Sequence, residues 1–483
     1  MSDTGPLLTL GQPNVGARRE SYSSGVVRAV WTVAPAFAVA ARPQDLVRRP
    51  DEPLWSSVRT PETPLGWIEV QSSRRRALRA IIVKLHRLQN DVWGEKYLAL
   101  EIQEELLCRI TRAERVIQSK RAQVKQLKNE LKARNHDRQK VLVIRSAMAD
   151  QEKIVLSEKG WIVTLKSIGD GIAFIYADRF DLKNFAFHPA PGFITGKRGA
   201  RLERSILRHT FHLGLVAVLH DLTHTLRHAD LTVFHPNRPP MMIEAKSGRG
   251  GNFARLQRQM EAMTKISDYL RTDELIEEHG IRRRVEAHND IVDHGSKVTR
   301  LAASLEPGSS IIEEVEPGLH YWLTDWYCPN SSIESTMREF TGRRIMFFQV
   351  NQMKQVHQGY LPFVLTLVDA DVATRFYAGE LFITIILDLD LVTEIMRKNG
   401  LDFSVIEDSA TFWTVRPLEK PGATNEGLSY IPYHPIGRIA AEFVTLDWLL
   451  KSIIHLHRST TQLYDDIKAS PPSIDVMRKI FGL

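Results

Sequence analysis

Two carboxylates and a lysine lie close together in one short stretch of the chain, between Ala229 and Lys246. Asp230 begins one apolar run, and Glu244 and Lys246 end the next one. The residues between the runs, HPNRP, favour a turn, so the runs are predicted to be neighbouring antiparallel strands. Side chains alternate between the two faces of a strand, so each strand is expected to have an apolar face and a face that carries charge.

Pairing of these strands would bring the carboxylates of Asp230 and Glu244 together, where they repel unless a cation lies between them. Oxygen ligands suit Mg²⁺ or Mn²⁺, which keep several waters and accept phosphate oxygens. Lys246 would then hold a water or stabilise charge on a phosphate. The loop at residues 247–251 is rich in glycine and contains Arg249, which suits close approach to a phosphate. The alternative is a solvated sheet face with one surface ion pair.

The pattern Asp230…Glu244-Ala245-Lys246 resembles the core motif of the PD-(D/E)XK, or restriction-endonuclease-like, nucleases. The resemblance covers roughly residues 168–270. It departs from the family name at Ala229, which stands where the name has Pro. The resemblance implies a mixed sheet flanked by helices, in the order helix, three strands, helix, strand.

The resemblance also implies further site residues. Glu203, in a helical stretch before the strands, is the candidate for a third metal-binding acid beside Asp230 and Glu244. Gln259, or else Gln257, is the candidate on the helix that follows the strands. The implied activity is Mg²⁺- or Mn²⁺-dependent hydrolysis of nucleic-acid phosphodiester bonds, with DNA favoured over RNA. Restriction, phage defence, repair and mobile-element maintenance are the implied settings.

Basic residues cluster near the predicted site. The chain has a net charge of +7 and a pI of about 9.2, which favours an anionic partner. Phosphate-backbone contacts are expected from basic residues on both sides of the motif; these are Lys197, Arg198, Arg201, Arg249 and Arg255. The alternative reading of such a cluster is a solvated basic helix face.

Composition predicts a protein of the cytoplasm. Two cysteines in 483 residues fit a reducing compartment and give no disulfide scaffold or Cys-rich zinc site. The sequence has no run of 18 or more apolar residues, so neither a transmembrane helix nor a membrane partner is expected.

The chain is predicted to be a multidomain α+β protein. We expect a disordered or loosely packed segment at 1–65, a helical arm at 66–157, the nuclease-like core at 158–304 and an accessory α+β domain at 305–483. The last of these is the expected site for a protein partner. Within it, strands are expected at 344–350, 361–368 and 381–387, and an amphipathic helix at 440–456.

A heptad pattern marks the arm, which is expected to be helical throughout from Arg74 to about Lys140. Apolar residues recur every seven positions at Ile110, Ile117, Val124 and Leu131. The pattern predicts either a coiled coil, with a homodimer through the arm, or an antiparallel helical hairpin. After the arm, the stretch 168–176 is expected to form short strands, with Asp170 in a turn.

Three rival interpretations remain. His220-Asp221, with His224 and His228, resembles a metal site of HD-type phosphohydrolases. The pairs Asp369/Asp371 and Asp388/Asp390 suit divalent ions, although Asp390 also suits the start of a helix. Finally, the chain could be a non-catalytic nucleic-acid-binding or scaffold protein with an inactive core.

Overall fold

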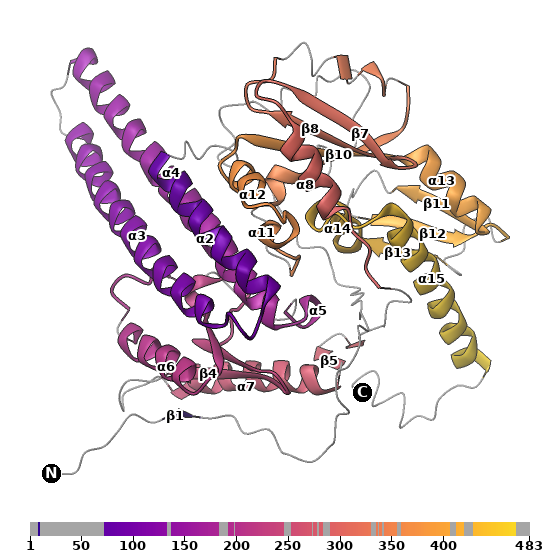
Figure 1. Ribbon diagram of the computed structural model, residues 1–483, viewed down its shortest axis with the longest axis horizontal. Helices are drawn as coiled ribbons and strands as arrows, with labels where there is room; N and C mark the ends of the chain where they lie inside the picture. The colour runs from indigo at the N-terminus through magenta and orange to yellow at the C-terminus, as the bar shows by residue number, and fades with distance from the viewer. Residues whose placement is uncertain are drawn as a thin grey trace.

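The computed structural model describes residues 8–9, 72–132, 137–182, 192–197, 199–245, 253–272, 274–277, 280–283, 290–329, 335–336, 338–340, 342–354, 359–405, 412–419 and 428–469 (Figure 1). Within these residues the protein is α+β, with helices and several small antiparallel sheets. None of the described helices is long and apolar enough to cross a membrane.

Three helices open the described chain: α2 (Ser72–Asn90), α3 (Tyr97–Lys132) and α4 (Arg138–Tyr176). The prediction of one continuous helix from Arg74 was wrong. The chain turns between α2 and α3, where the carboxylate of Asp91 accepts the N–H of Gly94 at 2.9 Å. A side chain that satisfies a nearby backbone donor in this way competes with the helix.

Helices α3 and α4 form an antiparallel hairpin whose far end projects away from the rest of the molecule (Figure 1). The heptad residues Ile110, Ile117 and Val124 are buried in it. The hairpin alternative is therefore confirmed. The apolar heptad residues of α3 pack inside the hairpin of the same chain. A homodimer through the arm stays a prediction and would need another surface.

The predicted strands at 168–176 were wrong, because α4 continues to Tyr176. Leu165, Ile168 and Ile172 are fully buried at helical spacing. Gly169 permits close approach of the helix to a loop, since a Cβ there would lie 1.9 Å from the carbonyl oxygen of Leu222. The glycines that predict a turn are here a packing requirement of a helix.

The predicted core region follows the expected order of elements. These are α6 (Ala200–His212), β2 (Val216–Leu219), the short helix η3 (His220–Leu222), β3 (Leu231–His235), β4 (Arg238–Ala245), α7 (Phe253–Thr272) and β5 (Glu274–Glu277). The strands form an antiparallel sheet in the order β1-β4-β3-β2, with β1 at Leu8–Thr9. Strand β5 pairs with β6 (Gly280–Arg283) in a separate sheet. Among the described residues all pairings of this sheet are antiparallel, so the mixed sheet implied by the resemblance is not found there.

The sheet is buried on both faces, which the sequence pattern did not predict. Helix α6 contacts β2 and β3, while α3 and α4 contact β2. Thr232 and Phe234 are as buried as Leu231 and Val233 on the opposite face. Glu244, near the end of β4, therefore lies in a covered layer, where its charge needs a partner.

Strand β2 is an edge strand that a side chain completes. Gln103 of α3 is fully buried and donates to the carbonyl oxygen of Ala217 at 2.8 Å. Its amide oxygen accepts the N–H of Leu219 at 2.9 Å. This amide satisfies backbone groups that an edge strand otherwise leaves unpaired.

A second group of elements follows (Figure 1). A sheet in the order β7-β8-β10-β9 consists of Ser310–Glu316, Leu319–Asp325, Leu381–Asp388 and Ile345–Gln349. A second sheet joins β11 (Leu401–Val405), β12 (Phe412–Pro417) and β13 (Ser429–Pro432). The remaining helices are α5 (Arg179–Leu182), α8 (Gly295–Ser304), α10 (Val350–Met353), α11 (Phe363–Thr366), α12 (Ala370–Tyr377), α13 (Leu389–Lys398), α14 (Tyr433–Ala441) and α15 (Leu446–Ala469).

The strands predicted around 344–350 and 381–387 are confirmed as β9 and β10. The strand predicted at 361–368 was wrong, because this segment forms the short helix α11. The helix predicted at 440–456 is interrupted between α14 and α15, where Phe443 has φ 53°. Such a positive φ ends a helix.

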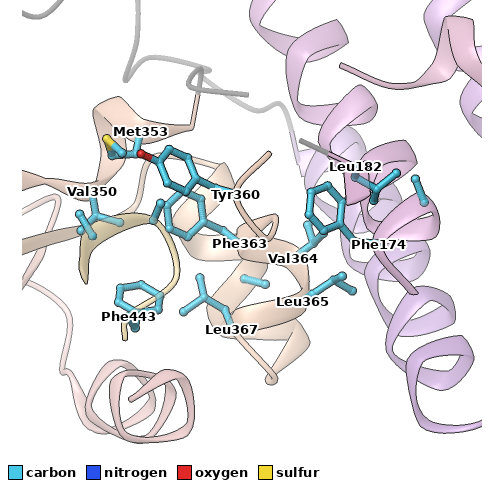
Figure 2. Close-up of a cluster of buried hydrophobic side chains, with 14 of the residues drawn as sticks. Phe174, Leu182, Val350, Met353, Tyr360, Phe363, Val364, Leu365, Leu367 and Phe443 are labelled. Atoms are coloured by element: carbon cyan, nitrogen blue, oxygen red, sulfur yellow. The ribbon is translucent and has the colours of Figure 1, made fainter. Parts of the chain in front are cut away.

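One contiguous set of buried apolar side chains extends from α2 to α15. At the junction in Figure 2, Val364 and Leu365 of α11 lie toward Phe174 of α4 and Leu182 of α5. The other labelled residues of the cluster are Val350, Met353, Tyr360, Phe363, Leu367 and Phe443. The predicted boundary at 157/158 falls inside α4.

Candidate active site

The strand pair β3–β4 brings Asp230 and Glu244 together. Leu231 pairs with Ile243, and the N–H of Asp230 donates to the carbonyl oxygen of Ile243 at 3.0 Å. The carboxylate of Asp230 also accepts the N–H of Ala245 at 2.9 Å, so Asp230 bonds to the residues on both sides of Glu244. Glu244 is buried, with 5% of its surface exposed. The predicted antiparallel neighbours are confirmed, and the facing of the two carboxylates stays a prediction.

Helix α6 adds a third acid to this site. Its buried face consists of Glu203, Leu207, Thr210 and Phe211, at the spacing of an amphipathic helix. The apolar members anchor the helix on the sheet, and Glu203 lies one turn before Leu207. Glu203 is 4% exposed, so its carboxylate lies in the covered layer.

The ammonium of Lys197 joins three carboxylates from different elements. Its Nζ lies 3.0 Å from Glu203 Oε1, 2.9 Å from Asp221 Oδ2 and 3.2 Å from Asp230 Oδ1. These residues come from α6, from η3 and from the position just before β3. Asp221 was not predicted as part of this site, because in the sequence it stood out only as the neighbour of His220 in the HD-type alternative. We call the three acids around Lys197, which are Glu203, Asp221 and Asp230, the acid cluster.

Lys197 supplies one positive charge for the three carboxyl groups of the acid cluster, and the pKa shifts reflect this. Burial and, after it, the charge of Asp230 raise the pKa of Glu203 to about 6, against the opposing effect of Lys197. Burial alone would lower the pKa of Lys197. The carboxylates of Asp221, Asp230 and Glu203 outweigh burial and raise it well above its ordinary value. The lysine is therefore charged at neutral pH.

Buried acids of α3 and α4 hold the loops that carry the cluster. Glu114 accepts the N–H of Ile194 at 3.0 Å and that of Thr195 at 2.7 Å, just before Lys197. Asp170 accepts the N–H of His224 at 2.9 Å and that of Thr225 at 2.8 Å, just after η3. Each carboxylate satisfies two backbone donors that no helix or sheet would satisfy. The hairpin thus positions Lys197 and Asp221.

The His220 ring is used in the core and not in the cluster. Its Nδ1 accepts the N–H of Ala229 at 3.1 Å, and its Nε2 lies 2.7 Å from the hydroxyl oxygen of Thr232. Burial lowers its pKa to about 3, so the ring is neutral. Both ring nitrogens are engaged by the protein, and the HD-type alternative gains no support from this geometry.

The pairs of aspartates near the C-terminal sheet serve as helix caps. Asp369 accepts the N–H groups of Asp371 and Val372 at the start of α12. Asp388, and not Asp390, caps α13 in the same way. Asp371 and Asp390 form exposed ion pairs with Arg79 and Arg344. Capping is the common role of such residues at helix N-termini.

Several predicted site residues are not placed by the structure. Lys246, Arg198 and Arg249 lie outside the described residues. Gln259 and Arg255 lie on α7, but their side chains are outside the described part. Their predicted roles stay predictions.

The other predicted basic residues are placed on or beside α6. Arg201 is exposed on α6, in one stripe with Arg204 and Arg208. Lys197, predicted to contact phosphate, is held by the acid cluster instead. Its predicted phosphate contact stays a prediction.

The donor chemistry of the cluster fits Mg²⁺ or Mn²⁺, because all its acidic members offer oxygen. Its present spacing fits an ammonium group. Among the described residues, no three carboxylate, imidazole or thiolate groups close on one point at the spacing of metal ligands. Ammonium–carboxylate distances of 2.9–3.2 Å compare with about 2.1 Å for Mg²⁺–oxygen, so an ion would draw the carboxylates inward.

Comparison of the chain with protein-family models, with curated proteins and with solved structures finds no match. Function is therefore inferred from the residues and geometry of the site alone.

Proposed function

We propose that the protein is a metal-dependent nuclease that hydrolyses phosphodiester bonds of DNA. The observation that carries the proposal is the convergence of Glu203, Asp221 and Asp230 on one cation, with Glu244 beside Asp230 on the sheet. Of these four acids, Glu203 and Glu244 are buried, and Asp221 and Asp230 are partly buried. A purely structural role would need fewer acids, since each buried carboxylate without a partner is costly.

Each acid has a stated role in this proposal. Asp230, Glu244 and Glu203 would hold Mg²⁺ or Mn²⁺, and Asp221 would join them or orient the ion's waters. When bound, the ion supplies a water of lowered pKa and stabilises charge on the phosphate. Lys246 directly follows Ala245 at the end of β4, where its ammonium would position the attacking water. Gln259 on α7 would orient the site.

The surface of α6 supports a polyanionic substrate. Arg201 and Arg204 are exposed, and no ion pair joins either of them to a side chain in the described part of the chain. Exposed arginines that lack acidic neighbours suit phosphate contacts. DNA in the cytoplasm is the proposed substrate, and RNA is a separate arm of the test.

A cleavage assay tests the proposal. Wild type is incubated with linear, circular and single-stranded DNA and with RNA, in Mg²⁺, Mn²⁺ or EDTA. Variants Asp230→Asn and Lys246→Ala are compared with Asp268→Asn, an exposed acid of α7 paired with Arg271. We expect metal-dependent cleavage by wild type and by Asp268→Asn alone. Wild type that cleaves no substrate in any metal would favour the non-catalytic binding or scaffold protein.

A further inference from the structure

The ammonium group of Lys197 lies at the point where the three carboxylates of the acid cluster converge. Three carboxylates from three elements lie within 3.2 Å of its Nζ. Its side chain is 33% exposed, while those of Glu203, Asp221 and Asp230 are 6%, 15% and 14% exposed. The lysine therefore reaches into the cluster from its solvent side.

The backbone that carries Lys197 is fixed independently of the cluster. Glu114 binds the N–H groups of Ile194 and Thr195 and also the hydroxyl of Thr195, the last at 2.7 Å. Glu114 is 3% exposed and belongs to α3. The side chain of Lys197 can therefore leave the carboxylates by rotation of its own bonds while the loop stays in place.

An ammonium group and a divalent ion cannot both sit among the same oxygens. Each requires close contact with the carboxylates, and the two cations repel each other at that distance. In the absence of metal the ammonium reduces repulsion between Glu203, Asp221 and Asp230. Binding of an ion must therefore remove Lys197 from at least part of the cluster, and the free energy of those contacts is subtracted from the affinity for the ion.

We propose that Lys197 is an internal counter-cation that organises the acid cluster before metal binds and is displaced by the metal. The proposal rests on the proposed function, since it requires that the cluster binds a divalent ion. It assigns Lys197 a positioning role, distinct from the phosphate contact that its sequence predicts. The displaced ammonium remains at the solvent side of the cluster, because Glu114 holds its loop.

Calorimetric titration with MnCl₂, without nucleic acid, tests the proposal on the full-length protein. Lys197→Met keeps an unbranched side chain but removes the charge. Lys297→Met is the matched control, since Lys297 is 26% exposed and pairs with Glu313 at 3.1 Å, away from the cluster. We expect Lys197→Met to bind Mn²⁺ about tenfold or more tightly than wild type, while Lys297→Met is unchanged. Without metal, the Tm of Lys197→Met should be the lower.

The possible outcomes separate the two proposals. Equal or weaker Mn²⁺ binding by Lys197→Met overturns the counter-cation role while leaving the metal site and the nuclease in place. Absence of Mn²⁺ binding in both proteins overturns the metal site, and the counter-cation role with it.

A measurement on wild type covers the case in which Lys197→Met does not fold. Lysines are acetylated with and without saturating Mg²⁺, and the modified residues are identified by mass spectrometry. We expect the modification of Lys197 to increase with Mg²⁺ while that of Lys297 stays constant. An unchanged modification of Lys197 would contradict its displacement.

Discussion

The carboxylate of Asp230 accepts the backbone N–H of Ala245 at 2.9 Å, which ties the start of β3 to the end of β4. Its other oxygen lies 3.2 Å from Lys197 Nζ. The hydrogen bond orients Asp230 beside Glu244, the residue that precedes Ala245. These contacts hold the Asp230 carboxylate at the end of β4 and do not depend on a bound ion. Such preorganisation is what a catalytic metal site requires.

Asp170 makes the stability of the fold depend on pH. Burial raises its pKa from 3.8 to about 6, although the N–H groups of Thr225 and His224 lower it. Because the pKa is higher in the folded state, the stabilising contribution is complete below pH 3.8 and is lost as pH rises through about 6. The loss amounts to about 3 kcal/mol.

The variant Asp170→Asn isolates this effect, because asparagine keeps an acceptor for the two N–H groups and does not ionise. We expect the free energy of unfolding of the variant, relative to wild type, to increase by about 3 kcal/mol between pH 4 and pH 8. Urea denaturation at several pH values measures the difference. A difference that does not vary with pH would show that Asp170 is not the titrating group.

Position 169 of α4 should tolerate no side chain, because it contacts the backbone of η3. A Cβ at residue 169 would lie 1.9 Å from the carbonyl oxygen of Leu222, and a backbone atom cannot move aside cheaply. Gly169→Ala should destabilise the protein by more than about 3 kcal/mol or prevent folding.

Thermal denaturation compares Gly169→Ala with Gly192→Ala, whose added Cβ would have no atom within 4 Å. The control should stay within about 1 kcal/mol of wild type. Equal Tm values for the two variants would mean that α4 and the Leu222 loop are farther apart than described.

The exposed arginines of α6 should contribute to DNA affinity through counterion release. Removing Arg201 and Arg204 together should reduce the slope of log K against log salt concentration by about 2. Fluorescence anisotropy with duplex DNA in EDTA measures this without cleavage. Arg397→Ala, an exposed arginine of α13, is the control. A slope that is the same for the double variant and the control would assign DNA contact to another surface.

The neighbouring strands β3 and β4 follow from the sequence because they depend on local rules. Alternation along the two strands and the turn between them are sufficient to bring Asp230 close to the end of β4. Glu203 was expected from the family resemblance, and the structure places it on the buried face of α6. These are relationships within about 45 residues, where register and helical spacing determine position.

The parts that sequence analysis missed depend on contacts between distant segments. Glu114 and Thr195 are separated by 81 residues, and Asp170 and Thr225 by 55. No periodicity marks a buried acid whose partners are backbone N–H groups of a later loop. The prediction of strands at 168–176 was wrong because the glycines serve close packing, Gly169 against Leu222 and Gly171 against Leu85 and Val364, which only the folded chain reveals.

The most direct test of the proposed metal site is the position of a bound ion. Crystals of the wild-type protein are soaked in MnCl₂, and anomalous diffraction locates the manganese. The account predicts an anomalous peak about 2.1 Å from carboxylate oxygens of Asp230 and Glu244, with the ammonium of Lys197 withdrawn from Asp230. Manganese bound only elsewhere, with Lys197 still joined to Asp221 and Asp230, would contradict it.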